Sequence, residues 1–409
     1  MEPKIRFKGF EGEWKEYSLG EVGSIYSGIG FPECEQGGRS GIPFYKVSDM
    51  NNQGNESIMH SSNNYVSDKQ IQRNHWKICS ETPAIFFAKV GAAVMLNRKR
   101  IVLEPCLCDN NTMMFSLSKD KWSTNFALPL FNNVDFPSLA QVGSLPSFNG
   151  SQVKEIKVKL PKFEEQEMVG KYFTSLDSQI SASTSRLASL KQMKAASLQA
   201  MFPQEGETVP KIRFKGFEGE WKKVKLNECL EISKERNING EYGINEVLSV
   251  SDEEGVMNQI KLLGRSFAGK SVTNYKVLRT NQVVYTKSPL KAKPYGIIKV
   301  NKGDTGIVSV LYAVYDVKVN TNPDYIHYYF DPTFRINSYL LPLINKGAKN
   351  TMNISDEVSL QGYISLPSLA EQQAIASYFT SLDRQISLQS QRLEKLKQIK
   401  SACLDKMFV

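Results

Sequence analysis

The chain has 409 residues, of which 41% are hydrophobic, and it carries a formal net charge of +9 with a pI near 9.0. No apolar run reaches eighteen residues, and Glu2, Pro3 and Lys4 do not open a signal peptide, so we expect a cytoplasmic protein without a membrane span. The length predicts two to three domains, and the positive charge favours an anionic partner, most often nucleic acid.

The first predicted element in chain order is the segment PKIRFKGFEGEWK at residues 3–15, which recurs without change at residues 210–222. Residues 160–202 likewise recur at 366–408, where 23 of 43 aligned positions are identical. The chain is therefore one duplicated cassette. The middle parts, residues 16–159 and 223–365, show no convincing alignment to each other beyond their ends.

Both middle parts contain short runs of β-branched and aromatic residues broken by Gly, Asn, Pro and Ser. These runs are Ile42–Val47, Ala84–Val90, Val283–Thr286, Gly296–Val300 and Gly306–Val319. Neither middle part alternates strands with helices regularly, which predicts an irregular, mainly antiparallel α+β fold. The predicted domains are residues 1–160, a helix at 161–203, residues 204–366, and a second helix at 367–409.

Cationic and amide side chains cluster between the predicted strands. Arg and Lys suit phosphates and guanine edges, whereas Asn suits adenine edges, so these clusters are candidate DNA-binding residues. They are Lys46, Lys89, Arg98, Arg100, Asn110, Asn111 and Asn149 in the first domain, and Lys287, Lys291, Lys293, Tyr295, Lys346, Lys349 and Asn350 in the second. The alternative for any single cation is an ordinary solvated surface charge. We expect charge reversal at Lys291 and Lys293 to weaken DNA binding.

The two C-terminal segments of the cassettes predict helices of about 38 residues, or roughly 57 Å at 1.5 Å per residue. Hydrophobic residues fall at the a and d positions of a heptad repeat: Phe173, Leu176, Ile180, Leu187 and Leu190 in the first helix, and Phe379, Leu382, Ile386, Leu393 and Leu396 in the second. Ser183 and Gln389 interrupt the repeat. Each helix could pack on its own domain, but a narrow apolar stripe favours packing of the two helices on each other as an antiparallel coiled coil with a pseudo-two-fold axis.

The six cysteines, Cys34, Cys79, Cys106, Cys108, Cys229 and Cys403, follow no repeat register, which favours reduced thiols. Cys106 and Cys108 have no histidine nearby, so we expect no zinc site.

Two short motifs resemble catalytic or cofactor sites. Residues 264–271, GRSFAGKS, satisfy the phosphate-loop pattern, but the flanking sequence lacks the required strand and helix. Residues 322–325, NPDY, resemble the N-P-P-[FY] loop of amino-methyltransferases without its second proline. We find no catalytic constellation and predict a recognition or assembly protein.

The arrangement resembles the specificity subunit of type I DNA restriction–modification systems over essentially the whole chain. The resemblance lies in the LP-x3-EQ openings at 160–166 and 366–372, the FTSLD-x-QI helices and the duplicated cassette. Residues 42–50 and 269–288 are similar to segments of the family's target recognition domains, and FKGFEGEW is similar to the start of each such domain.

This resemblance implies that each middle domain recognises one half of a bipartite, asymmetric site in double-stranded DNA, while the helices set the gap. It implies two methyltransferase subunits, which bind S-adenosylmethionine, and restriction subunits, which use ATP and Mg. It assigns no cofactor, metal or catalytic residue to this chain.

Three other hypotheses stay open at this point. A self-contained methyltransferase or restriction enzyme would need the missing cofactor loop, and would bind S-adenosylmethionine alone. A phosphate-loop nucleotidase would bind nucleotide through Lys270. A scaffold that bridges other proteins would show no sequence-dependent DNA binding.

Overall fold

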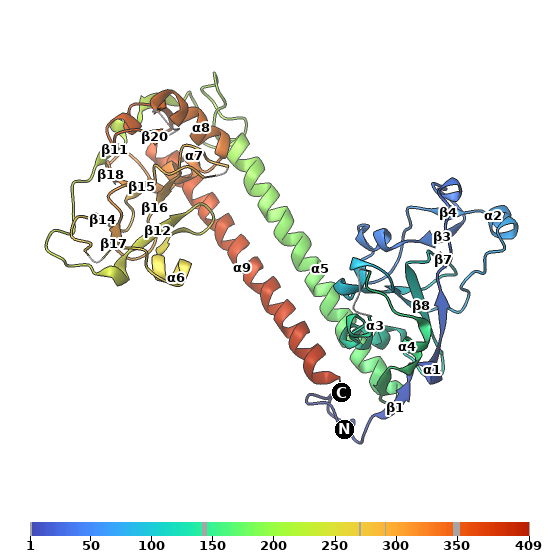
Figure 1. The fold of residues 1–409 in the computed structure, drawn as a ribbon. Helices are drawn as coiled ribbons and strands as arrows, with labels where there is room; N and C mark the ends of the chain where they lie inside the picture. Colours follow the sequence, from blue (N-terminus) through green and yellow to red (C-terminus); the bar gives the residue numbers. More distant parts are fainter. Residues whose placement is uncertain (1, 141–144, 270, 291, 347–351, 409) are drawn as a thin grey trace. The chain divides into compact units, whose positions relative to one another are not determined.

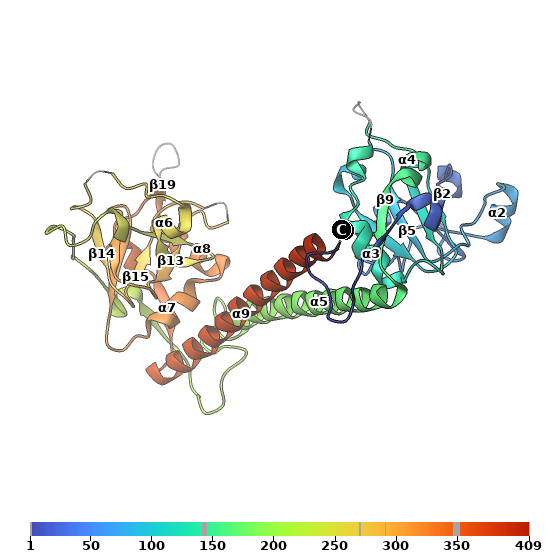
Figure 2. The same cartoon turned by 90° about the horizontal axis from the view of Figure 1, so that it is seen from below.

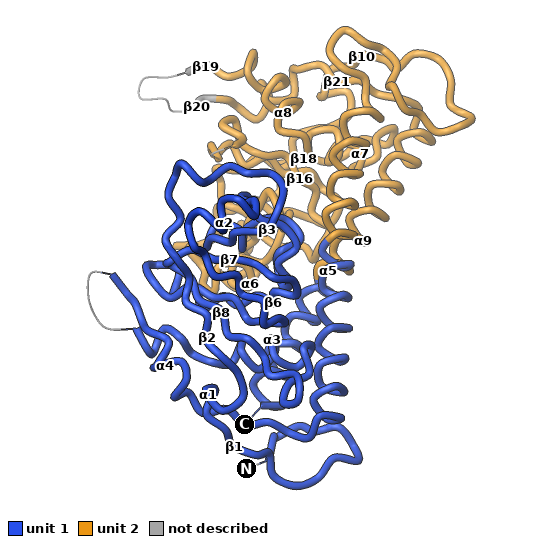
Figure 3. Tube along the Cα trace, turned by 90° about the vertical axis from the view of Figure 1, so that its right-hand side faces the viewer, with its two compact units in different colours: residues 1–184, 391–409 blue, residues 185–390 orange. Residues whose placement is uncertain are grey.

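The computed structural model describes residues 2–140, 145–269, 271–290, 292–346 and 352–408. The chain divides into two compact units, residues 1–184 with 391–409 (unit 1) and residues 185–390 (unit 2), coloured separately in Figure 3. Each unit therefore contains one middle part together with portions of both long helices. No helix in the described ranges is long and apolar enough to cross a membrane.

In unit 1 the first middle part forms short strands and helices (Figure 1). They are β1 Lys15–Ser18, α1 Leu19–Val22, β2 Gly23–Ser27, β3 Ile42–Tyr45, β4 Tyr65–Val66, α2 Asp68–Arg73, β5 Ala84–Ala88, β6 Lys99–Val102, β7 Leu107–Cys108, β8 Thr112–Leu117, α3 Thr124–Asn133, α4 Gly150–Glu155 and β9 Lys157–Leu160. The central sheet has the antiparallel order β2-β8-β5-β6. All five side chains of β5, AIFFA, are buried, because this strand has packed neighbours on both faces.

In unit 2 the second middle part again forms short elements. They are β10 Lys222–Lys225, β11 Leu230–Ile232, β12 Leu248–Ser251, β13 Gly255–Asn258, α6 Gln259–Leu263, β14 Lys276–Leu278, β15 Val283–Tyr285, β16 Ile298–Val300, β17 Gly306–Val308, β18 Ala313–Val317, α7 Pro323–Phe330, α8 Thr333–Leu340, β19 Asn345–Lys346, β20 Met352–Asn353 and β21 Tyr363–Leu366. The central sheet is antiparallel with the order β11-β18-β15-β16. The run Gly306–Val319 is two strands separated by a turn, not one strand.

The central sheets of the two middle parts share one strand order although the sequences of the middle parts do not align. In each unit the first strand of the central sheet in chain order pairs with the last one. These pairs are β2 with β8 in unit 1 and β11 with β18 in unit 2. A two-stranded antiparallel ribbon, β1-β9 or β10-β21, closes each unit. The prediction of a mainly antiparallel α+β fold is confirmed, with β3-β7 as a parallel pair.

The long helices are α5 Phe163–Ala200 and α9 Leu369–Met407, close to the predicted ranges. Within each unit they pack side by side and antiparallel (Figure 2). In unit 1 Lys400 pairs with Asp177 at 2.5 Å, and in unit 2 the equivalent Lys194 pairs with Asp383 at 2.8 Å. The prediction that the helices pack on each other is confirmed.

The predicted heptad positions differ in burial along the helices. Six of them, Phe173, Leu176, Leu190, Phe379, Leu382 and Leu393, are buried. The other four, Ile180, Leu187, Ile386 and Leu396, are half-buried. Phe173 and Phe379 also belong to the hydrophobic cores of units 1 and 2, so these two positions join the helices to the middle parts.

Each unit is completed by the C-terminal end of the other cassette's helix. In unit 1 Phe408, just after α9, packs against Trp14, Phe126 and Phe173 with ring centroids 5.5 to 6.2 Å apart. In unit 2 Phe202, just after α5, occupies the equivalent place against Trp221. The helices are therefore shared elements of both cores.

The buried side chain of Lys99 leads to a prediction of how the stability of the chain depends on pH. Its side chain is buried, and its Nζ donates to Asn97 Oδ1 and to the Val134 carbonyl, both at 2.6 Å. Burial lowers the pKa of Lys99 from its ordinary value of 10.5 to about 7.

Because that pKa is lower in the folded chain, the unfolded chain binds an extra proton between about pH 7 and pH 10.5. Stability should therefore rise with pH in this window relative to a Lys99→Met variant, by at most about 1.4 kcal/mol per pH unit. Denaturant unfolding of both proteins at several pH values measures the difference. A difference that does not change with pH contradicts the prediction.

Candidate nucleic-acid interface

One group of predicted DNA-binding residues gathers where β5 ends in unit 1. The Lys89 amide donates to the Asn111 carbonyl at 2.9 Å, and the Phe148 amide donates to the Lys89 carbonyl at 3.2 Å. Three loops therefore meet here, and they bring together Lys89, Asn110, Asn111 and Asn149. Both Asn110 and Asn111 are exposed. Lys89 Nζ donates to Ser27 Oγ at 2.6 Å, which holds the ammonium group in a defined position.

Asp109 lies in the same group and was not predicted from the sequence. It is only 6% exposed, and its Oδ1 has no hydrogen-bond partner among the described residues. Burial raises its pKa, while the Asn111 side chain, donating to Oδ2 at 3.3 Å, and the charge of Lys46 act in the opposite direction. Lys46 therefore belongs to this group as well. Because Oδ1 is buried, a DNA base cannot reach it, and Asp109 instead holds the Asn111 side chain in place.

Arg98 and Arg100 form a second group on β6 and the residue before it. Arg98 Nη1 donates to Asn51 Oδ1 at 2.7 Å, and Arg100 Nη1 donates to the Lys99 carbonyl at 2.8 Å. Burial, followed by the charge of Arg98, lowers the pKa of Arg100. Both side chains are half-buried, and neither forms an ion pair within the described residues. No described carboxylate is paired with either guanidinium group, so both groups can pair with an anionic partner.

In unit 2 Lys287 shares one carboxylate with a lysine that sequence reasoning missed. Asp356 accepts from Lys287 Nζ and, at 2.7 Å, from Lys276 Nζ. Hydrogen bonds from these two lysines lower the pKa of Asp356 against the effect of burial. Two cations with one acid leave a net positive charge at this place.

Lys293 does not lie where a phosphate can reach it. Its side chain is 5% exposed, pairs with Asp252 at 2.7 Å and donates to the Asp331 carbonyl at 2.8 Å. We therefore no longer propose that Lys293 binds DNA, because breaking its buried ion pair would cost more free energy than a surface contact with phosphate would supply. Tyr295 is half-buried and packs against the core of unit 2, and its carbonyl accepts from the Tyr285 hydroxyl at 2.7 Å.

Lys291, Lys349 and Asn350 lie outside the described residues, as does the side chain of Lys346, whose backbone belongs to β19. They stay predictions from the sequence.

The strand registers place Lys89 and Lys287 at the same position of their sheets. Gly23 of β2 and Leu230 of β11 are equivalent in the repeat, and each begins the pairing with β8 or β18. β8 also pairs with β5, and β18 also pairs with β15. When these pairings are aligned, Lys89, the residue just after β5, corresponds to Lys287. The two units thus share one lysine in otherwise unlike surroundings.

We predict that Lys89→Ala and Lys287→Ala each weaken binding of the assembled complex to its DNA site by about tenfold, and lower the magnitude of the salt slope by about one. Binding is measured by fluorescence anisotropy at several salt concentrations. Lys162→Ala, at an exposed lysine before α5, is the matched control. Unchanged affinity and slope in both variants would exclude these lysines as phosphate contacts.

The two motifs that resemble catalytic loops have structural roles. Gly264 ends α6 in a left-handed conformation, so a helix precedes residues 264–271 where a phosphate loop requires a strand. Asn322 Oδ1 accepts from the Asp324 and Tyr325 amides and caps α7. Among the described residues no group of three or more His, Cys, Asp or Glu side chains could hold a metal ion.

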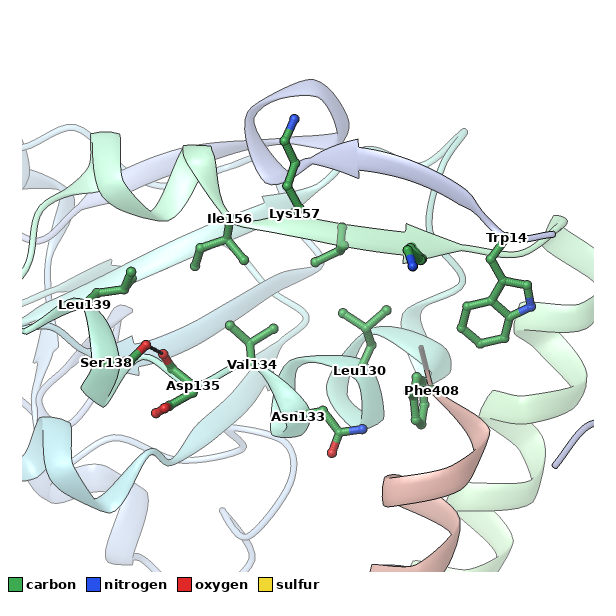
Figure 4. Close-up of a pocket in the computed structure, with 12 residues that line it drawn as sticks. Trp14, Leu130, Asn133, Val134, Asp135, Ser138, Leu139, Ile156, Lys157 and Phe408 are labelled. Carbon is green, nitrogen blue, oxygen red and sulfur yellow. Dashed lines mark hydrogen bonds between the residues drawn. The ribbon is translucent and has the colours of Figure 1, made fainter. Parts of the chain in front are cut away.

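Unit 1 also contains a pocket of about 310 Å³ between α3 and β9. Figure 4 shows Trp14 and Phe408 at one end and Leu139 at the other, with Lys157 at the rim. None of the predicted DNA-binding residues lines it. The pocket is therefore separate from the candidate interface.

The fold is that of a duplicated recognition protein with two unlike sheet domains on shared helices. A family described as the type I restriction modification DNA specificity domain matches residues 11–192 and 218–398. The chain belongs to this family.

A putative type I restriction enzyme specificity subunit, MjaX, from Methanocaldococcus jannaschii is 22% identical over 275 residues, which cover 63% of this chain and 60% of that relative's length. The crystal structure of a type I restriction–modification S subunit from M. genitalium matches 100% of this chain and 99% of its own, with a TM-score of 0.58 and 11% identity. A chain from a study of type I complex assembly and conformational transition covers 97% of this chain and 98% of its own, with a TM-score of 0.50 and 16% identity. At these identities the structural matches support the fold alone.

Proposed function

We propose that this chain is the DNA sequence-specificity subunit of a type I restriction–modification complex, and that each unit recognises one half of a bipartite, asymmetric site. The observation that carries the proposal is the combination of one central strand order with two unlike surfaces. The central sheets of both units share strand order, and Lys89 and Lys287 share a position. Around them stand Asp109 and Asn111 in unit 1, but Lys276 and Asp356 in unit 2. Unlike neighbours on one scaffold suit unlike half-sites.

We further propose that the chain itself is non-catalytic. On this account two methyltransferase subunits bind S-adenosylmethionine and methylate adenine, and restriction subunits use ATP and Mg. The residues described in units 1 and 2 would then bind and orient DNA, with cations on phosphates and amides on base edges. Half-sites about one helical turn apart, roughly 34 Å, face the same side of DNA.

Selection from a random duplex pool tests this proposal. The chain, assembled with its cognate methyltransferase subunit, should enrich two short, unlike sequences separated by a fixed gap. Lack of enrichment by an intact complex would favour a scaffold that bridges proteins. Binding of S-adenosylmethionine by the isolated chain would contradict the non-catalytic assignment.

A further inference from the structure

We propose that the pocket between α3 and β9 in unit 1 is a binding site for a small molecule that carries a phenol ring. The inference goes beyond the proposed function and does not depend on it. It comes from a comparison of the two units, because the space that forms the pocket in unit 1 is filled by the protein's own side chains in unit 2.

The helices α3 and α7 occupy equivalent positions in the two units. The residue before each helix donates its amide to the side chain of the same repeated glutamine. These contacts join Ser123 to Gln166 Oε1 and Asn322 to Gln372 Oε1, both at 2.9 Å. The two helices can therefore be aligned residue by residue from Ser123 and Asn322.

The ring contacts agree with this alignment. The third residue along from each aligned position is aromatic and packs against the equivalent tryptophan and phenylalanine of its unit. The ring centroids of Phe126 lie 5.9 Å from Trp14 and 5.5 Å from Phe408, and those of Tyr325 lie 6.1 Å from Trp221 and 5.6 Å from Phe202. About one helical turn later the aligned residues are Leu130 in α3 and Tyr329 in α7. Unit 1 thus has a leucine where unit 2 has a phenol ring.

In unit 2 the ring of Tyr329 fills the space between α7 and β21. Its centroid lies 5.9 Å from that of Phe202, and its hydroxyl accepts a hydrogen bond from the Ser365 amide at 3.4 Å. The Arg335 guanidinium lies 5.2 Å from the same ring centroid. As a result Tyr329 is only 9% exposed and Phe202 has no exposed surface. A phenol ring and a guanidinium group therefore close the core of unit 2 at this place.

In unit 1 the corresponding space is the pocket of about 310 Å³. The Leu130 side chain points from α3 toward β9, with Phe408 beside it (Figure 4). A leucine reaches less far than a tyrosine, so Phe408 stays half-buried, unlike its equivalent in unit 2.

A shorter side chain also takes the place of Arg335. Arg335 Nη2 donates to the Leu198 carbonyl at 3.0 Å, and the equivalent Leu404 carbonyl in unit 1 accepts from Asn133 Nδ2 at 2.7 Å. Asn133 is exposed and lines the pocket. Smaller side chains therefore replace both groups that fill the space in unit 2, and this difference opens the pocket.

The pocket also offers a hydrogen-bond donor for a phenol oxygen. Lys159 lines it and has the register position in β9 that Ser365 has in β21. The Leu19 amide donates to the Ile156 carbonyl, and hydrogen-bonded pairs alternate along an antiparallel ladder, so the Lys159 amide points away from β1. Among the described residues no side chain or loop carbonyl accepts from it. The corresponding amide in unit 2 is the one that binds the Tyr329 hydroxyl.

These groups define the chemistry of the ligand. Trp14, Phe408 and Leu130 provide an aromatic and apolar wall for a ring, and the Lys159 amide can donate to a hydroxyl on that ring. A volume of about 310 Å³ is at the lower end of the range for small-molecule pockets, which suits one substituted ring. Binding would complete the core of unit 1 where α9 ends, and a ligand that binds only the folded chain stabilises it.

Calorimetric titration of the full chain with p-cresol tests the inference, and toluene is the matched ligand without a hydroxyl group. Leu130→Tyr gives unit 1 the side chain that fills the space in unit 2. Leu103→Tyr makes the same change at an exposed residue of unit 1 and is the control variant. Asn133→Arg, at an exposed position, fills the pocket from another side and serves as the second variant if Leu130→Tyr does not fold.

We expect the wild type and the control variant to bind one p-cresol per chain with a Kd of about 0.1 to 1 mM. Toluene should bind the wild type at least about tenfold more weakly, because the Lys159 amide then lacks an acceptor. p-Cresol should bind Leu130→Tyr and Asn133→Arg at least about tenfold more weakly, and it should raise the thermal midpoint of the wild type but not of these two variants.

No saturable p-cresol binding by the wild type would overturn the inference, as would unchanged binding by a folded Leu130→Tyr or Asn133→Arg variant. Two equivalent sites per chain would contradict the difference between the units on which it rests. Toluene binding as tight as that of p-cresol would overturn the assignment of a phenol. None of these results bears on the proposed function, which the DNA selection tests separately.

Discussion

Replacing Phe202 with alanine is expected to destabilise unit 2 by about 3–5 kcal/mol, the usual cost of removing a fully buried phenylalanine. Phe202 has no exposed surface, and its ring lies 5.6 Å from that of Tyr325 and 6.1 Å from that of Phe379. The Arg335 guanidinium lies 4.6 Å from the ring centroid. The variant would leave a cavity where the first cassette's helix ends in the second cassette's core.

Phe408→Ala is the matched control in unit 1. Phe408 is half-buried, so the expected loss is smaller and confined to unit 1. Calorimetry of both variants, with hydrogen exchange to assign the destabilised unit, measures the effect. A loss below about 1 kcal/mol for Phe202→Ala would contradict the shared-core arrangement.

Glu371→Gln is expected to destabilise unit 2 by about 3 kcal/mol, because it removes the buried negative charge, and one of the two acceptor oxygens, that face the Arg213 guanidinium. Glu371 is 1% exposed and accepts from Arg213 Nε at 2.7 Å and from Nη2 at 2.8 Å. The same change at Glu165 should have a similar effect in unit 1, where Arg6 forms the same pair.

A double-mutant cycle with Arg213→Met isolates the pair. We expect the double variant to be more stable than the sum of the two single losses implies, with a coupling of about 2 kcal/mol in urea denaturation. Additive losses would show that the ion pair does not act as a unit.

The cassette frame could be predicted from the sequence because repetition is visible without any structure. The identical segments that open the two cassettes recur at an offset of 207 residues, and the heptad stripe from Phe173 to Leu190 and the prolines before each helix recur at an offset of 206. The contacts that these repeated segments make in the folded chain were harder to predict. That Phe202 and Phe408 cross between cassettes depends on contacts over long sequence separations, which no local pattern reports.

The middle parts show where sequence reasoning failed. Their common strand order was hidden because a strand needs only buried apolar residues, and AIFFA of β5 and VVY of β15 satisfy this equally well. The structure brings Lys89 and Asn111 close together, and their role in DNA binding stays a prediction. Residue type could not distinguish Lys293, which forms a buried ion pair, from a surface cation. Asp109 was missed because an aspartate followed by asparagines is also typical of an ordinary turn.

The most direct test of the central claim is a map of N6-methyladenine in a methylation-free host that expresses this chain with its cognate methyltransferase subunit. The account predicts a bipartite, asymmetric motif with a fixed gap, which disappears when this chain is omitted. No new motif, with both subunits soluble and associated, would contradict it.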